Sequence, residues 1–189
     1  MCWDGRSYFN CGECWESSRM ENEVVSWHKI VWNAWLACVK RLPSKDRLRQ
    51  WHIIHDNKCE FCDKDESFSL LFFQCCFTRE LWRKLLMYVH LYHEPGSLQD
   101  ELKFMEQNCK GRSLKSKLGR LVFCGVIHCI WMERNRRIFY KKKCDVETLL
   151  FQYVNKTRDR VHSWRNVPYT KANWRSCLEW GFPLSILKV

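Results

Sequence analysis

Residues 113–140 read SLKSKLGRLVFCGVIHCIWMERNRRIFY, and this stretch decides which kind of fold the chain can adopt. Its middle is apolar on every face of a helix, which is typical of a helix that is buried on all sides. The apolar run inside it, residues 121–132, is interrupted by His128 and is shorter than the roughly 20 residues that a membrane span needs. The stretch therefore predicts a long, buried helix from Ser113 to about Tyr140, and no membrane segment.

Helical patterns also precede and follow this stretch. Apolar residues recur at helical spacing from Val24 to Val39, and Thr78, Ser97 and Asp145 each stand where a helix would begin. Further helices are therefore predicted over residues 24–41 and 45–51, from Thr78 to the Pro95-Gly96 break, from Ser97 onward, and from Asp145 through Trp164. Residues 68–73, FSLLFF, read instead as a β-like run.

The composition of the whole chain narrows the class of protein. Its 189 residues suit one domain or two small ones, and a hydrophobic content of 46% with 15% aromatics excludes long disorder. The first ten residues contain no apolar signal core, so we expect an intracellular protein, nuclear or cytoplasmic. In that compartment the 13 cysteines would be reduced thiols or metal ligands rather than disulfides.

The positive charge is concentrated in one region. The chain has a net charge of +11, and residues 110–143 carry +10 of it, because Glu133 alone opposes eleven basic residues there. A concentrated positive surface suits a polyanion, so these residues are predicted to bind RNA or single-stranded DNA. The alternative is that they are merely solvated around a buried helix. The eleven are Lys110, Arg112, Lys115, Lys117, Arg120, Arg134, Arg136, Arg137, Lys141, Lys142 and Lys143.

The densest cysteine pattern lies between the first two groups of helices. Cys59 and Cys62 are separated by two residues, so a tight turn can bring both sulfurs to one side of a tetrahedral Zn²⁺. Twelve residues then separate Cys62 from Cys75, a loop long enough to return a third sulfur. The alternative is that these cysteines are small buried hydrophobic residues.

The fourth zinc ligand is less clear from the residues. His55, four positions before Cys59, is the better candidate, while Cys76 would point away from Cys75 on a strand. The carboxylates Asp63, Asp65 and Glu66 remain open as ligands. Cys11 and Cys14 form a separate pair. The 44 residues between Cys14 and Cys59 exceed the usual separation of roughly 15–20 residues.

The predicted fold class is mainly α. It is a small helical domain with a Cys-rich zinc loop, containing a short β-like hairpin, followed by long C-terminal helices. The expected organisation is an irregular lead-in (1–23), a helical zinc-binding-like domain (24–93), a basic helical extension (94–165) and a C-terminal tail (166–189).

Several motifs, in this order, resemble the zinc-binding domain that follows the reverse transcriptase in plant non-LTR (LINE-type) retrotransposons. They cover roughly residues 24–140. They are Trp27-His28-Lys29-Ile30-Val31-Trp32, Trp35-Leu36-Ala37, Lys40-Arg41-Leu42-Pro43-Ser44-Lys45-Asp46-Arg47-Leu48, Cys59-x-x-Cys62, Glu66-Ser67, Leu71-Phe72-Phe73-Gln74-Cys75, Trp82 and Ile130-Trp131-Met132-Glu133-Arg134-Asn135-Arg136-Arg137-Ile138-Phe139.

The resemblance implies a zinc-binding module without its polymerase. In the family a His before the Leu-Phe-Phe run is the fourth ligand, and Leu70 stands at that place here. The alternative function is therefore a structural or protein-interaction remnant with a degenerate metal site.

Enzymatic activity is not expected. The chain has no adjacent Asp pair to hold two metal ions for phosphoryl transfer. It also has no His-Glu-x-x-His motif and no nucleophile elbow, and nothing in it predicts a small-molecule substrate.

Overall fold

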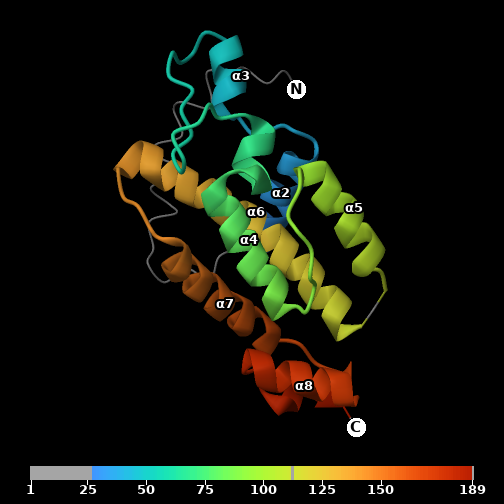
Figure 1. The fold of residues 1–189 in the computed structure, drawn as a ribbon. Helices are drawn as coiled ribbons and strands as arrows, with labels where there is room; N and C mark the ends of the chain where they lie inside the picture. The colour runs from blue at the N-terminus through green and yellow to red at the C-terminus, as the bar shows by residue number, and fades with distance from the viewer. Residues whose placement is uncertain (1–26, 112, 189) are drawn as a thin grey trace.

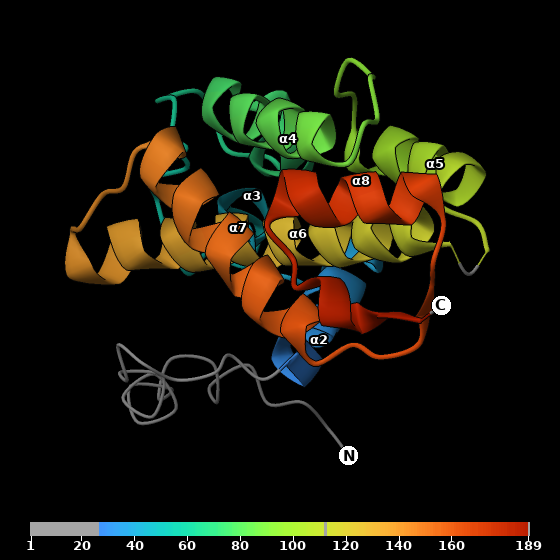
Figure 2. The ribbon, with the colours of Figure 1, turned by 90° about the horizontal axis from the view of Figure 1, so that it is seen from below.

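One long helix, α6 (Leu114–Tyr140), organises the computed structural model of the chain, which describes residues 27–111 and 113–188. It contacts α2, α4, α5, α7, α8 and η2, and Figure 2 shows it lying between α4 and α2. The prediction of a mainly α fold, with a long buried helix at this position, is confirmed (Figure 1).

The rest of the described chain forms further helices and two short strands. They are α2 (Trp27–Cys38), α3 (Lys45–Gln50), η2 (Leu70–Gln74), α4 (Cys76–Tyr88), α5 (Leu98–Asn108), α7 (Val146–His162), β1 (Val167–Pro168), α8 (Lys171–Trp180), η3 (Leu184–Ile186) and β2 (Leu187–Lys188). The two short strands pair in parallel and fasten the end of the described chain beside α8.

Helix starts follow the capping residues in the sequence. Ser97 accepts a hydrogen bond from the backbone N–H of Asp100, whose carboxylate accepts in return from the N–H of Ser97, so α5 begins with a capping box. The side chain of Asp145 likewise accepts from the N–H of Thr148 at the start of α7. These local bonds explain why the sequence alone located both helices.

Aromatic side chains fill the core where α4 and η2 meet α6. The ring of Trp82 lies 5.3 Å from that of Phe73 and 5.8 Å from that of Phe123, centroid to centroid. The Trp82 indole N–H donates to the buried carboxylate of Glu101 over 2.7 Å, so its polar atom is satisfied inside the core. Apolar packing and this hydrogen bond together fix α4 against α5 and α6.

A glycine in α6 permits the closest approach of α7. A Cβ atom at Gly125 would lie 1.9 Å from the phenolic oxygen of Tyr153, far inside contact distance. With no side chain there, the Tyr153 hydroxyl reaches the helix backbone and donates to the carbonyl of Leu121 over 3.0 Å.

The prediction of a β-like run over residues 68–73 is wrong. The chain is helical from Phe68 and continues as η2. Spacings of three and four residues bring Phe68, Leu71 and Phe72 into the core, and this burial outweighs the β preference of the aromatic residues. Phe72 (φ −101°, ψ 99°) already leaves the helical geometry and Phe73 takes a φ of 77°, so the helical path ends before the chain turns at Cys75.

Within the described residues, no helix is both long enough and apolar enough to cross a membrane. This agrees with the interrupted apolar run of residues 121–132.

Stability should depend on pH through His128. Burial in α6 lowers the pKa of His128 to about 4, and its Nδ1 lies 2.8 Å from the side-chain amide nitrogen of Asn33 in α2. In the unfolded chain a histidine takes up a proton near pH 6.5. The unfolded state therefore binds more protons between pH 6.5 and 4, and the free energy of unfolding falls over that window as the pH is lowered, by roughly 3 kcal/mol at most.

Urea unfolding of the wild type and of His128→Gln at several pH values measures this contribution. The variant should lose less stability on acidification, whereas His162→Gln, on the exposed end of α7, should behave like the wild type. Equal losses in the wild type and His128→Gln would contradict the assignment.

Candidate metal centre

Residues 58–65 form a tight hairpin that carries Cys59 and Cys62. Lys58 and Asp65 pair as an antiparallel bridge, and the N–H of Cys59 donates to the carbonyl of Lys64 over 2.7 Å. Asp63 has a φ of 57°, so the chain reverses directly after Cys62. The short β-like hairpin is therefore present, and it holds the two-residue spacing of Cys59 and Cys62 in a turn.

The structure brings three sulfur atoms together. The Sγ atoms of Cys59, Cys62 and Cys75 all lie within 4.8 Å of one another. A tetrahedral zinc–thiolate site has metal–sulfur distances of about 2.3 Å, and hence sulfur–sulfur edges of about 3.8 Å. The three sulfurs are thus compatible with zinc after only a small closure.

The sulfurs interact with each other and with the turn backbone. The N–H of Phe61 donates to Sγ of Cys59 over 3.5 Å. The hydrogen bond that Cys75 donates to Cys59, together with the N–H of Phe61, lowers the pKa of Cys59 to about 6. The hydrogen bond between the two thiols, together with burial, raises the pKa of Cys75. Burial also raises the pKa of Cys62. One thiolate is therefore already favoured at neutral pH, which suits a cation-binding site.

Cys75 and Cys76, which directly follow η2, have opposite surroundings. Cys75 is 1% exposed and faces the cluster, whereas Cys76 is exposed at the first position of α4. The N–H of Cys75 donates to the carbonyl of Leu70 over 2.8 Å, so the chain makes a wide turn that aims Cys75 at the hairpin.

The other candidate ligands lie elsewhere. His55 is exposed and outside the cluster, and the structure does not bring it to the sulfurs. Asp63 is exposed, and the carboxylate of Asp65 pairs with the ammonium group of Lys58. Cys11 and Cys14 lie outside the described residues.

Glu66, read from sequence as a possible ligand, instead anchors the loop. It is 1% exposed, and its carboxylate accepts hydrogen bonds from Nε and Nη2 of Arg134, the shortest being 2.7 Å. The same carboxylate accepts from the backbone N–H of Lys45 over 2.7 Å. Residues from α3, the metal loop and α6 therefore meet at one buried ion pair.

Lys45 holds the hairpin from the other side. Its ammonium group, nearly buried, donates to the carboxylates of Asp56 and Glu60 and to the carbonyl of Lys58, over 3.0, 2.7 and 2.7 Å. A cation with three oxygen partners fixes the strand that leads into Cys59.

Arg137 makes a second link between the metal loop and α6. Its guanidinium lies 4.6 Å from the ring centroids of both Phe61 and Phe77, and it donates to the carbonyl of Glu60 over 3.0 Å. It also donates to the carboxylate of Glu133 and to the carbonyl of Cys144. Phe61, inside the Cys59–Cys62 turn, is thus packed on Arg137 at the end of α6.

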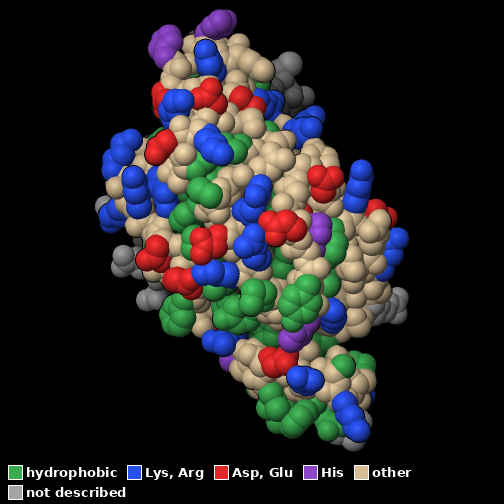
Figure 3. All heavy atoms as spheres, in the orientation of Figure 1, with side chains coloured by type: hydrophobic (Ala, Val, Ile, Leu, Met, Phe, Trp, Pro, Cys, Tyr) green, Lys and Arg blue, Asp and Glu red, His purple; other side chains and the backbone are tan. Residues whose placement is uncertain are grey.

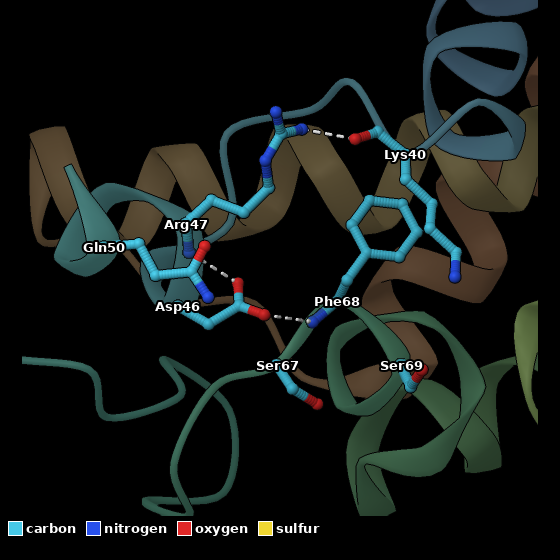
Figure 4. A pocket seen from close by; sticks show the side chains of 7 residues that line it. All are labelled: Lys40, Asp46, Arg47, Gln50, Ser67, Phe68 and Ser69. Atoms are coloured by element: carbon cyan, nitrogen blue, oxygen red, sulfur yellow. Dashed lines mark hydrogen bonds between the residues drawn. The ribbon is translucent and has the colours of Figure 1, made fainter.

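A polar hollow lies next to the loop, lined by residues of α3 and of the turn before η2 (Figure 4). The carboxylate of Asp46 accepts from the N–H of Arg47 and, over 3.3 Å, from that of Phe68. The guanidinium of Arg47 donates to the carbonyl of Lys40. Asp46 thereby fixes the start of the helical turn that ends at Cys75.

The eleven basic residues separate into buried and exposed groups. Arg134 and Arg137 are 3% and 7% exposed, and Arg136 pairs with Glu133, so the first two belong to the loop anchor and not to a surface. Lys110 pairs with Glu106, and Lys115, Lys117 and Arg120 are exposed on the first turns of α6. Lys141, Lys142 and Lys143 are exposed after its end, and Arg112 lies outside the described residues.

The sequence reasoning missed the anchoring roles of Lys45, Glu66, Arg134 and Arg137. One signal was available. Glu133 is the single acid of residues 110–143, and it stands three and four positions before Arg136 and Arg137, a spacing that pairs side chains on one helix face.

Residues 9–82 match the family described as zinc-binding in reverse transcriptase. This confirms the resemblance to the reverse transcriptase zinc-binding domain as far as Trp82. The matched segment includes all three clustered cysteines, and the motif at residues 130–139 lies outside it. No curated protein and no solved structure matches the chain.

Removing Arg134 from its buried ion pair with Glu66 should lower the free energy of unfolding. Arg134→Met leaves the Glu66 carboxylate buried without its cation, which typically costs about 3–5 kcal/mol of unfolding free energy. Urea denaturation measures the loss. Arg175→Met is the matched control, because Arg175 is 79% exposed in its pair with Glu179 and should cost less than about 1 kcal/mol. Equal effects would contradict the anchoring role of Arg134.

Metal binding should distinguish two neighbouring cysteines. Cys75→Ser should weaken zinc binding by about 100-fold or more, since even outer-shell changes cost about 10–100-fold, and Cys76→Ser should leave it unchanged. Competition with a chromophoric chelator measures both affinities. Similar affinities for the two variants would argue against the sulfur cluster as the metal site.

Proposed function

We propose that the protein is a zinc-binding module derived from a plant non-LTR (LINE-type) retrotransposon that binds RNA or single-stranded DNA. Binding, rather than catalysis, is its function, and it acts in the nucleus or cytoplasm. The family match over residues 9–82 supports the zinc-binding part of this proposal. The nucleic-acid part rests on the exposed end of α6.

One observation carries the nucleic-acid proposal. Lys141, Lys142 and Lys143 are exposed directly after Tyr140, whose side chain is 54% exposed. In Figure 3, Lys and Arg side chains gather on the edge of the molecule where α6 ends. Exposed lysines neutralise phosphates, and exposed rings stack on unpaired bases, which is the usual combination in single-strand binding proteins.

The opposite end of α6 is less available for a ligand. Arg120 donates to the carbonyls of Cys109 and Gly111, and Lys115 donates to the carbonyl of His90. The ammonium group of Lys117 lies 5.9 Å from the ring centroid of Trp164. These contacts hold the side chains on the protein, so the binding surface is assigned to residues 140–143.

Metal binding supports the same surface indirectly. Arg137 joins the carbonyl of Glu60, inside the Cys59–Cys62 turn, to the carbonyl of Cys144, directly after the lysines. A metal ion that orders the turn would therefore also order the segment that carries the positive charge.

The alternative function is a structural or protein-interaction remnant with a degenerate metal site. Leu70 favours it, because the residue is aliphatic and no fourth side-chain donor accompanies the three sulfurs in residues 27–111 and 113–188. One tightly bound zinc per chain in the purified protein would count against this alternative. Its absence, with a poorly cooperative melt, would favour it.

Charge removal at residues 141–143 tests the nucleic-acid proposal. The triple substitution Lys141→Gln, Lys142→Gln and Lys143→Gln should weaken binding to single-stranded RNA or DNA. It should also lower the slope of log K against log salt by about 2, since each phosphate contact on a single strand contributes about 0.7.

Fluorescence anisotropy across a salt series measures both quantities. The matched control replaces Lys103, Lys171 and Lys188 with Gln, which removes the same charge from exposed positions outside residues 110–143. Equal losses in the two triple variants would contradict the assigned surface, as would wild-type affinity no tighter than that of an unrelated basic protein.

A further inference from the structure

Within the described part of the chain, the three clustered sulfurs are one donor short of a tetrahedral site. Among residues 27–111 and 113–188, no other His, Cys, Asp or Glu ligand atom joins Cys59, Cys62 and Cys75. All seven histidines of the chain fall within those ranges, so no histidine of the chain lies in the cluster. Zinc held by three protein ligands commonly keeps its fourth position for a ligand from solution.

The position beside Cys75 carries no donor atom. The N–H of Cys75 donates to the carbonyl of Leu70 over 2.8 Å, and this bond closes a wide turn that brings the backbone of residue 70 next to that of Cys75. The Leu70 side chain is only partly buried, and it lies outside the main hydrophobic core. Of the three cysteines, Cys62 is also only partly buried, so solvent reaches the cluster at this residue.

The charge around the site favours a neutral fourth ligand. Residues 56–66 contain five carboxylates, from Asp56, Glu60, Asp63, Asp65 and Glu66. Five cations offset them, because Lys45 reaches in from α3, and Arg134 and Arg137 from α6, to join Lys58 and Lys64 of the loop. Three thiolates with one Zn²⁺ then carry a net negative charge that the balanced loop does not cancel, so this charge would oppose a second anion at the fourth position.

We propose that the centre is a three-thiolate site whose fourth coordination position takes a neutral nitrogen donor of the imidazole type from outside the chain. This inference rests on the metal-binding half of the proposed function and is independent of nucleic-acid binding. Leu70 is then the residue that keeps the position open.

Cobalt substitution of the full chain separates the two questions. The sulfur-to-cobalt charge-transfer band reports whether Co²⁺ binds to the thiolates, and the visible d–d bands report the fourth ligand. Free imidazole, titrated into the Co²⁺-loaded wild type, should shift the d–d bands saturably with one imidazole per cobalt. The charge-transfer band should persist throughout. The same titration at two protein concentrations distinguishes free imidazole from a histidine of a second copy, since only the latter makes the starting spectrum depend on concentration.

Leu70→His supplies the matched variant. Its spectrum without imidazole should resemble that of the imidazole-saturated wild type, imidazole should not change it, and Co²⁺ should bind at least about tenfold more tightly. Leu70→Ala, which adds no donor, and His55→Ala should both respond like the wild type. Failure of the wild-type spectrum to respond, with the charge-transfer band present, would mean that a group of the chain already fills the position and would overturn the proposal. Absence of the charge-transfer band would overturn metal binding itself.

Discussion

The buried ion pair between Glu66 and Arg134 is the interaction on which the arrangement of the metal loop depends. Removing two charges from water is costly, and the cost is offset only when the remaining hydrogen-bonding positions are filled. Here the carboxylate also accepts from the N–H of Lys45, and Nη1 of Arg134 donates to the side-chain oxygen of Asn135. The guanidinium additionally lies 4.9 Å from the Trp131 ring centroid. Glu66 and Arg134 are 68 positions apart, so this pair forces the loop and the end of α6 into one unit.

Much of the fold follows from local patterns that a sequence displays directly. The all-round apolar middle of residues 113–140 predicted α6, and Ser97 and Asp145 located two helix starts, because capping and helical periodicity act within a few residues. Residues 68–73 were misread since burial of Phe68, Leu71 and Phe72 depends on neighbours far along the chain. The clustering of Cys59, Cys62 and Cys75 was predictable from their spacing. The inward direction of the Arg134 and Arg137 side chains could not be predicted. A basic residue on a helix has the same sequence signature whether it meets a phosphate or a buried carboxylate.

The end of α6 therefore combines two kinds of positive charge with opposite surroundings. Arginines 134 and 137 lie inside, where a planar guanidinium can satisfy several acceptors at once. Lysines 141 to 143 lie outside, where a strongly hydrated ammonium group loses little by staying exposed. The division matches the chemistry of the two side chains, and it confines the free charge to a short segment beyond the last helical turn.

The family match ends at Trp82, inside the hydrophobic core and not at its boundary. The matched segment ends there, yet the core that buries Trp82 includes Phe123 of α6 and continues through α7 to α8. A chain that stopped at this boundary would leave the Glu66 carboxylate without Arg134 and the Phe61 ring without Arg137. The segment that matches the family is thus smaller than the packed core to which it belongs. The later helices therefore supply contacts that keep the metal loop in shape.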